Sequence, residues 1–175
     1  MVRHIKKILF TTDLSKSAIE VFEQTVALAT QTGASIVMLH VIEDGSTSGQ
    51  NRTVHLVNKD DYEKIRNDRS NMVKNVLIGK MKSIPLIQNA LQELGKNAND
   101  KMCVENIPPV IIDDIIVLYG IAADLITQMT EIAECDLVVM GYHKKGSILK
   151  ALMGSAGKRV LQQSKKPLML VPLES

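Results

Sequence analysis

The sequence predicts an α/β fold, in which a single open and mostly parallel sheet carries helices on both faces. Five short apolar segments alternate with four helical segments along the chain, and such alternation specifies parallel strands joined by crossover helices. The apolar segments are continuous, as expected for strands buried on both faces. With 175 residues, 45% of them hydrophobic, the chain is long enough for a substantial core. We therefore expect one domain spanning residues 1–175, without a linker.

The first strand, the first helix and the second strand are clearly marked. Residues 6–14, KKILFTTDL, form a short apolar segment typical of a buried parallel strand. Ser17 and Glu20 then form a Ser-x-x-Glu capping box, and Gly33 predicts the end of the helix. Residues 35–42, SIVMLHVI, predict the second strand. Four residues between them recur at helical spacing and are expected to face the core: Ile19, Phe22, Val26 and Ala29.

The middle of the chain is less regular. Residues 43–57 begin as a polar loop rich in Gly and Ser. The pattern is then helical over about residues 58–95, and Pro85 is expected to kink or split this segment because proline lacks a backbone donor. Residues 96–101, KNANDK, predict a turn, and residues 106–109, NIPP, predict an extended connector.

The C-terminal half returns to strand–helix alternation. A third strand is expected within 110–120, a helix over 121–135, a fourth strand over 136–141, a helix over 154–164 and a fifth strand over 167–173. The helix over 121–135 is amphipathic and places four apolar residues on one side: Leu125, Ile126, Met129 and Ile132.

Charge is distributed unevenly along the chain. The net charge is +2, but residues 137–175 hold seven Lys/Arg and one acidic residue, a net charge of +6, whereas residues 1–136 have a net charge of −4. A local excess of this kind indicates an anionic ligand near the C-terminal third, and a solvated basic face remains the alternative. Two Phe, three Tyr and no Trp argue against a surface that stacks nucleic-acid bases.

The sequence shows no pattern typical of a targeting signal, and its two cysteines do not form a disulfide framework. We therefore expect a cytoplasmic protein. No segment reaches the roughly 18 to 20 apolar residues that a membrane-spanning helix needs. The N-terminal segment has no cleavage-site pattern and is typical of a first strand. Cys103 and Cys135 lack the spacing of metal ligands, so both are expected to be packing residues.

Two predicted strand ends carry candidate site residues. Thr11, Thr12 and Asp13 follow the first strand, and Met140 and Gly141 end the fourth. In open α/β sheets, ligands bind outside the carboxyl ends of the strands, at the point where strand order reverses. If strands one and four are neighbours, these residues face one another across one crevice.

The segment 140–160, MGYHKKGSILKALMGSAGKRV, contains four glycines, five Lys/Arg and no acidic residue. Gly154 and Ser155 stand at a predicted helix start, where exposed backbone N–H groups and the helix dipole favour an anion. The pattern predicts a phosphate site. The alternative is that Gly141 and Gly154 are only turn and cap residues. A P-loop is excluded, because other residues occupy its required Gly and Ser/Thr positions.

These segments together resemble the universal stress protein family. The resemblance runs through KKILFTTDLSKSA, SIVMLHVIE and DLVVMGYHKKGSILKALMGSAGKRVLQQSKKPLMLVPL, and is loosest in the middle of the chain. Nucleotide-binding members carry Gly-x2-Gly-x9-Gly-Ser/Thr. Gly141, Gly154 and Ser155 fall at its offsets, whereas Lys144 replaces the second glycine and Gly146 lies two residues further on.

The resemblance implies strand order 3-2-1-4-5, an adenine-nucleotide alpha-hydrolase-like arrangement, and an ATP or AMP ligand with or without Mg²⁺. It implies that Asp13 contacts the ribose and that Thr11 and Thr12 line the adenine side, while Val41 meets the adenine edge through its backbone. Lys144 either blocks close backbone approach or places an ammonium on a phosphate. The residues implied to hold the phosphates are Gly141, His143, Gly154, Ser155 and Ala156. The further cofactor-binding candidates of this segment are Met140, Lys144 and Gly146.

The resemblance also implies a homodimer, formed by antiparallel pairing of the strand over 167–173 with a second copy. Pro172 limits the length of that pairing. The expected function is that of an adenine-nucleotide-binding stress-response regulator. The alternative is a stress protein that binds no nucleotide and acts through its dimer as a protein-interaction module. No base or nucleophile can be assigned, so at most slow ATPase activity is expected.

Four titratable residues also have structural interpretations. His40 lies in a buried-strand pattern and is expected to be a core residue with its hydrogen bonds satisfied. His143 is either a phosphate ligand or an exposed loop residue. Asp113 and Asp114 are not expected to act as an acid–base pair, because neighbours in a strand point to opposite faces.

Overall fold

The computed structural model describes residues 4–43, 83–143 and 155–173. Its sheet has the strand order β3-β2-β1-β4-β5, and every neighbouring pair is parallel. The strands are β1 (Lys7–Thr12), β2 (Ser35–Ile42), β3 (Ile112–Tyr119), β4 (Leu137–His143) and β5 (Leu168–Leu173). The predicted fold class and strand order are confirmed. β4 runs two residues further than the sequence indicated, through His143.

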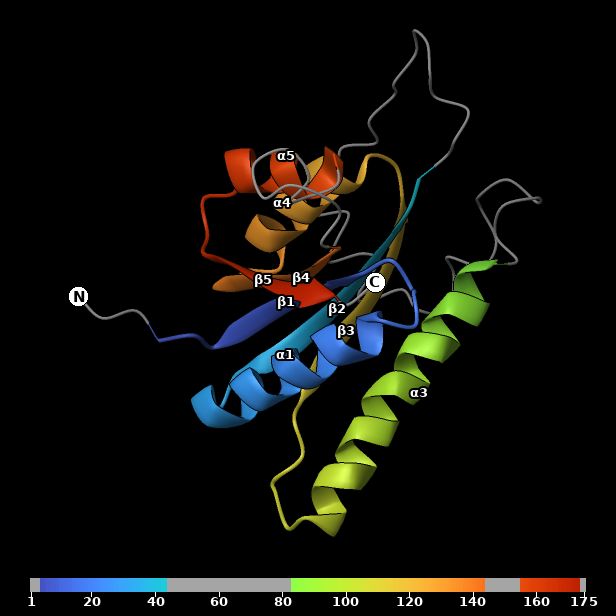
Figure 1. Cartoon of the computed structure of the whole chain (residues 1–175), viewed down its shortest axis with the longest axis vertical. Helices are drawn as coiled ribbons and strands as arrows, with labels where there is room; N and C mark the ends of the chain where they lie inside the picture. The colour runs from blue at the N-terminus through green and yellow to red at the C-terminus, as the bar shows by residue number, and fades with distance from the viewer. Residues whose placement is uncertain (1–3, 44–82, 144–154, 174–175) are drawn as a thin grey trace, which may run out of the picture.

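Helices cover both faces of this sheet (Figure 1). One face carries α1 (Ala18–Thr32) and α3 (Ser83–Val104), and the other carries α4 (Ala122–Ile132) and α5 (Ser155–Gln163). The core therefore has two apolar layers. Phe10 of β1 meets Phe22 of α1 in the first layer, with ring centroids 5.0 Å apart. The adjacent Leu9 points to the second layer, because side chains alternate along a strand.

The limits of α1 follow the sequence signals, but its cap and its buried face differ in detail. Gly33 ends the helix in the left-handed conformation, with φ of 70°, and its N–H donates to the Ala29 carbonyl. The predicted side-chain cap is wrong, because Ser17 is itself helical and its hydroxyl makes no capping bond. Ile19 is also wrongly placed and is 49% exposed. The buried face consists of Ala18, Val21, Phe22, Thr25, Val26 and Ala29.

The predicted turn over 96–101 is wrong, because α3 continues through it to Val104. Asn and Asp are weak helix formers, but tertiary packing outweighs propensity here. The side chains that pack on the core recur at helical spacing along the whole element. They are Ile87, Leu91, Leu94, Ala98 and Met102.

Pro85 and Gly95 stand at different places in α3 and have different roles. Pro85 lies in the first turn of α3, where a missing N–H interrupts no helical hydrogen bond, so it does not split the described helix. Gly95 is inside the helix, and a Cβ there would lie 3.2 Å from Cγ1 of Ile112. Gly95 thus permits α3 to pack closely on β3. The rest of the predicted helical segment, residues 58–82, lies outside the described residues.

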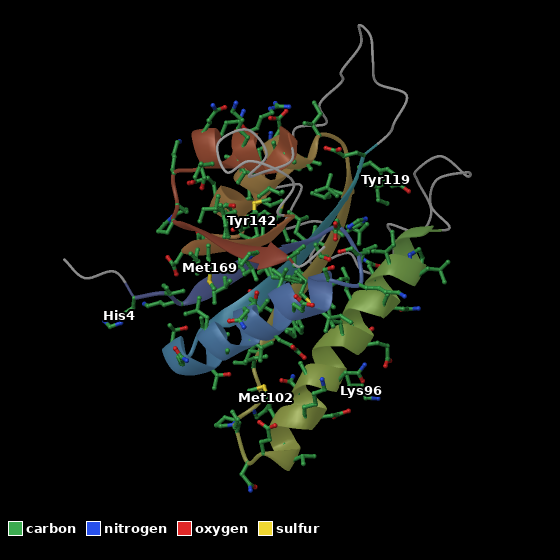
Figure 2. The ribbon with its side chains drawn as sticks, in the orientation of Figure 1. His4, Lys96, Met102, Tyr119, Tyr142 and Met169 are labelled. Carbon is green, nitrogen blue, oxygen red and sulfur yellow. The ribbon has the colours of Figure 1, made fainter. Side chains whose placement is uncertain are left out.

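The elements of the C-terminal half confirm the sequence-based prediction. Leu125, Ile126 and Met129 of α4 are buried, and Ile132 packs against the same cluster. In Figure 2, Tyr142 and Met169 mark β4 and β5, and Met102 lies near the end of α3. Among the described residues, none of the helices combines the length and apolar character that crossing a membrane requires.

Asn99 anchors the connection between α3 and β3. Its Nδ2 donates to the Val110 carbonyl over 3.1 Å, and its Oδ1 accepts from the Val110 N–H over 2.9 Å. The amide side chain thus imitates a neighbouring strand and satisfies both backbone groups of one residue. Asn99 lies in the second half of α3, and its partner Val110 lies 11 positions later, beyond the end of that helix.

We predict that Asn99→Ala lowers the free energy of unfolding by about 1–3 kcal/mol, because two partly buried backbone groups lose their partner. The control is Asn97→Ala, since Asn97 is an exposed residue of the same helix. Urea denaturation of both variants measures the difference. Equal stability of the two variants would contradict the anchoring role.

The two cysteines differ in exposure. Cys103 is exposed near the end of α3, whereas Cys135 is 0% exposed. Burial raises the pKa of the Cys135 thiol to about 12, and only the thiolate is reactive. The prediction that both are packing residues therefore holds for Cys135 and is wrong for Cys103.

We predict that a thiol reagent at neutral pH labels Cys103 in the folded protein and labels Cys135 only after unfolding. Mass spectrometry of the labelled chain, with and without denaturant, checks this. In Cys103→Ser, the folded protein should take up no label. Rapid labelling of that variant would contradict the burial of Cys135.

Candidate functional site

A pocket opens where β1 and β4 separate. β1 is paired with β2 up to Thr12 and His40, but it is paired with β4 only up to Phe10 and Val139. Within the part of the chain that the structure describes, the last two residues of β1 therefore have a strand on one side only. This is the point at which strand order reverses, where open α/β sheets bind ligands. The pocket has a volume of about 340 Å³.

Seven of the predicted site residues line this one pocket. They come from the ends of three strands and from the first turn of α5, which the fold brings together (Figure 1). They are Thr11, Thr12, Asp13, Val41, Met140, Gly141 and Ala156. The sequence-based expectation that the ends of strands one and four face one crevice is confirmed by this arrangement.

The other predicted site residues are described only in part. Lys144, Gly146 and Gly154 lie outside the described residues. His143 is described by its backbone as the last residue of β4, and Ser155 as the first residue of α5.

The β1–α1 turn, residues 12–15, presents Asp13 through a set of short hydrogen bonds. Thr12 Oγ1 accepts from the Leu14 N–H over 3.0 Å, and Asp13 Oδ1 accepts from the Ser15 N–H over 2.9 Å. Such local bonds are typical of Thr and Asp in turns. Leu14 is left-handed, with φ of 63°, which costs a residue with a Cβ about 1–2 kcal/mol. Side-chain hydrogen bonds thus hold this turn in a strained conformation.

Thr11 closes the gap that β4 leaves open. It is 8% exposed, and its hydroxyl donates to the Val139 carbonyl over 3.4 Å. This contact replaces the missing backbone pairing between β1 and β4. The Thr11 hydroxyl of the pocket lining therefore has a partner within the protein.

Gly141 is required by packing as well as by its place in the pocket. A Cβ at this position would lie 2.8 Å from Val21 Cγ2 and 2.9 Å from Leu173 Cδ1. The alternative that Gly141 is a turn residue is wrong, since it lies within β4. Its missing side chain lets α1 and β5 approach the strand, and it leaves the strand backbone facing the pocket.

Two polar residues of the pocket were not predicted as site residues. Glu43 follows β2, and its Oε1 accepts from the Ala122 N–H over 2.9 Å, so it caps the first turn of α4. His40 was expected to be a core residue, but it lines the pocket and is half-buried. Both lie in the segment SIVMLHVIE that carries the family resemblance, but neither was singled out as a site residue. Six apolar residues complete the walls: Ala18, Val21, Leu39, Ala122, Ile126 and Leu173.

An ion pair positions α5 beside the pocket. Arg159 Nη2 of α5 lies 2.8 Å from Asp124 Oδ1 of α4. The next residue, Val160, is 0% exposed and packs in the second apolar layer of the core. The first turn of α5 consequently reaches the pocket through Ala156. The N–H groups and the dipole of a helix start favour an anionic group at this side.

Other charged residues serve the opposite end of the sheet. Asp113 lies 2.7 Å from Lys7 Nζ, and Asp114 Oδ1 accepts from the Ile115 N–H over 2.8 Å. Both carboxylates stand where β3 begins, at a shift of register opposite β2. They are away from the carboxyl ends of the strands, so the structure does not bring them into the pocket. Among the described residues, no group of three or more His, Cys, Asp and Glu is arranged to hold a metal ion.

The pocket combines an apolar interior with polar groups at its rim. Leu39, Val41, Ile126 and Met140 suit a flat apolar ring, and Asp13 and the Thr hydroxyls suit hydroxyl groups. Across the pocket stands a helix start that favours an anion. The arrangement is thus suited to a ligand with an aromatic ring, hydroxyl groups and an anionic end.

Comparison with known proteins identifies relatives over nearly the whole chain. Residues 4–172 match the family described as the universal stress protein family. The universal stress protein MJ0577 of Methanocaldococcus jannaschii is 26% identical over 167 residues, covering 95% of this chain and 94% of that protein. The solved structure of MJ0577 superposes with a TM-score of 0.59 at 23% identity, covering 99% of each chain.

Two further solved structures share the fold and contain a bound nucleotide. A universal stress protein in complex with cAMP has a TM-score of 0.55 at 17% identity and covers 97% of this chain and 98% of its own. A universal stress protein from Archaeoglobus fulgidus in complex with dAMP has a TM-score of 0.50 at 12% identity, with 96% and 98% covered. From the family match over residues 4–172, this chain belongs to the universal stress protein family.

Proposed function

We propose that this protein binds an adenine nucleotide, ATP or AMP, in the pocket at the carboxyl ends of β1, β2 and β4. The observation that carries the proposal is the meeting of seven candidate residues from four distant segments in one pocket of about 340 Å³. A volume of this order is typical of small-ligand sites, about 300–1,000 Å³. The cAMP and dAMP complexes of other universal stress proteins support the same class of ligand.

The proposed binding mode assigns each part of the ligand to a part of the pocket. The adenine ring lies against Val41 and the Thr11–Thr12 strand end, and the Asp13 carboxylate accepts hydrogen bonds from the ribose. The phosphates lie toward Gly141 and the start of α5, where the helix dipole stabilises negative charge. Lys144, Gly146 and Gly154 are proposed to complete the phosphate side.

The proposed role is regulatory rather than catalytic. The Ser15 N–H orients the Asp13 carboxylate. A carboxylate held in this way is suited to accepting a hydrogen bond from a ribose hydroxyl. ATP, with or without Mg²⁺, therefore acts as a bound signal in a stress-response regulator, with at most slow hydrolysis. The cytoplasm remains our proposed location.

We also propose that two copies of the chain pair through β5. Within the described residues, β5 is paired with β4 on one edge, and an unpaired apolar edge tends to pair with another chain. Pro172 has no backbone N–H and shortens the ladder that two copies can form.

We predict that Asp13→Asn weakens ATP binding at least about 10-fold, because the ribose loses a charged acceptor. Asparagine keeps the oxygen that accepts from the Ser15 N–H, so the turn itself is preserved. The control is Glu131→Gln, an exposed acid of α4 outside the pocket. Calorimetric titration of nucleotide-free protein with ATP and Mg²⁺ measures all three affinities, beside a Gly154→Val variant that should lose binding.

Absence of ATP and AMP binding by the folded parent protein would overturn the nucleotide proposal. The glycines would then be structural, and a protein-interaction module would be the better interpretation. Equal affinities of the parent and Asp13→Asn would instead show that the ribose contacts another group. Release of phosphate in the same samples reports whether hydrolysis accompanies binding.

We predict that sedimentation equilibrium gives a mass of twice the 19.3 kDa of one chain. Hydrogen exchange of the β5 amides should slow with rising protein concentration, because pairing protects the edge of a strand. A single-chain mass at all concentrations would contradict the dimer proposal.

A further inference from the structure

His40 makes a contact at the pocket that the proposed binding mode leaves unused. Its Nδ1 lies 2.8 Å from the backbone carbonyl oxygen of Thr12. A carbonyl oxygen can only accept, so the proton of this hydrogen bond is on His40 Nδ1. His40 therefore donates from β2 to the last residue of β1.

The Thr12 carbonyl, which accepts this hydrogen bond, lies at the start of the β1–α1 turn. Thr12 is the last residue of β1 paired with β2, and it lies two residues beyond the last pair with β4. From Thr12 the chain enters the strained turn whose Asp13 carboxylate bonds to the Ser15 N–H. The position of Thr12 thus sets the direction in which the Asp13 carboxylate points.

We infer that His40 is a positioning residue for the nucleotide: its Nδ1–H fixes the Thr12 carbonyl and so holds Asp13 in place for the ribose. This inference rests on the proposed adenine-nucleotide binding. It assigns the selectivity for ribose hydroxyls to a pair of residues, with Asp13 as the contact and His40 as its support. His40 itself need not touch the ligand.

Two substitutions separate the hydrogen bond from the bulk of the side chain. In His40→Asn, the amide nitrogen takes a place close to that of Nδ1 and can still donate to the Thr12 carbonyl. In His40→Gln, the amide nitrogen lies closer to the place of Nε2, beyond the reach of that carbonyl. The two variants carry the same functional group, so a difference between them reports the position of the donor.

The measured quantity is the ratio of the dissociation constants for 2′,3′-dideoxy-ATP and ATP, since the analogue lacks both ribose hydroxyls. We expect a ratio of about 10 or more for the parent protein, as for loss of a charge-assisted hydrogen bond. His40→Asn should keep this ratio, and in His40→Gln it should fall toward about 1, because a loosely held Asp13 no longer distinguishes the two ligands. Thermal unfolding of each variant verifies that it is folded.

Equal ratios in the parent, His40→Asn and His40→Gln would overturn the inference. A measurement on the unaltered protein gives an independent test: at about pH 9, where histidine side chains are ordinarily neutral, the ring ¹⁵N shifts of His40 should place the proton on Nδ1. A proton on Nε2 would also overturn the inference, even if both variants fail to fold.

Failure of the proposed function has a different signature. If the parent protein binds neither ATP nor the analogue, the nucleotide proposal fails, and hydrogen exchange of the Leu14 and Ser15 amides then decides the role of His40. Slow exchange in the parent and His40→Asn, with fast exchange in His40→Gln, would retain His40 as the support of the turn. Equally slow exchange in all three would remove that role as well.

Discussion

The pocket and the contacts around it follow from the early separation of β1 from β4. β1 keeps its pairing with β2 to the end of the strand, but it leaves β4 after Phe10. The order of the strands proceeds outward from this point in both directions, with β2 and β3 on one side and β4 and β5 on the other. A crevice at this point is a consequence of the strand order, because no crossover connection closes it. Every pocket residue described above stands on its walls or rim.

Side chains bond to polar backbone groups near the point where β1 and β4 separate. Thr11 reaches the Val139 carbonyl, and His40 reaches the Thr12 carbonyl. Glu43 likewise accepts a hydrogen bond from the Ala122 N–H in the first turn of α4. Unpaired buried backbone groups are costly, so these contacts stabilise the fold at the same place where they shape the pocket. The stability of the fold and the shape of the pocket therefore depend on one set of hydrogen bonds.

Close packing and ligand access are likewise joined at Gly141. α1 and β5 approach this residue so closely that a methyl group would contact Val21 and Leu173 below ordinary distances. The same missing side chain leaves backbone exposed to the pocket. A glycine that belongs to a nucleotide signature can thus be required by the core alone, which is why the residue type by itself does not distinguish binding from packing.

Elements with a strong local pattern could be predicted from the amino-acid sequence alone. Continuous apolar strands, the apolar stripes of α4, and Gly33 at the end of α1 are recognisable because they repeat or stand at fixed offsets. The candidate residues at strand ends, such as Asp13 and Gly141, followed from the same reasoning. Local propensity failed at 96–101, where Asn and Asp predicted a turn and packing of Ala98 and Met102 on the sheet kept the helix.

The further side chains that complete the pocket are recognisable only from the arrangement of the strands in space. His40 bonds to a residue 28 positions away, and Glu43 to one 79 positions away. The local sequence pattern does not indicate these contacts, because they depend on which strands become neighbours and where their pairing stops. The sequence therefore shows which residues stand at the ends of the strands, and the arrangement of the strands decides which of them meet.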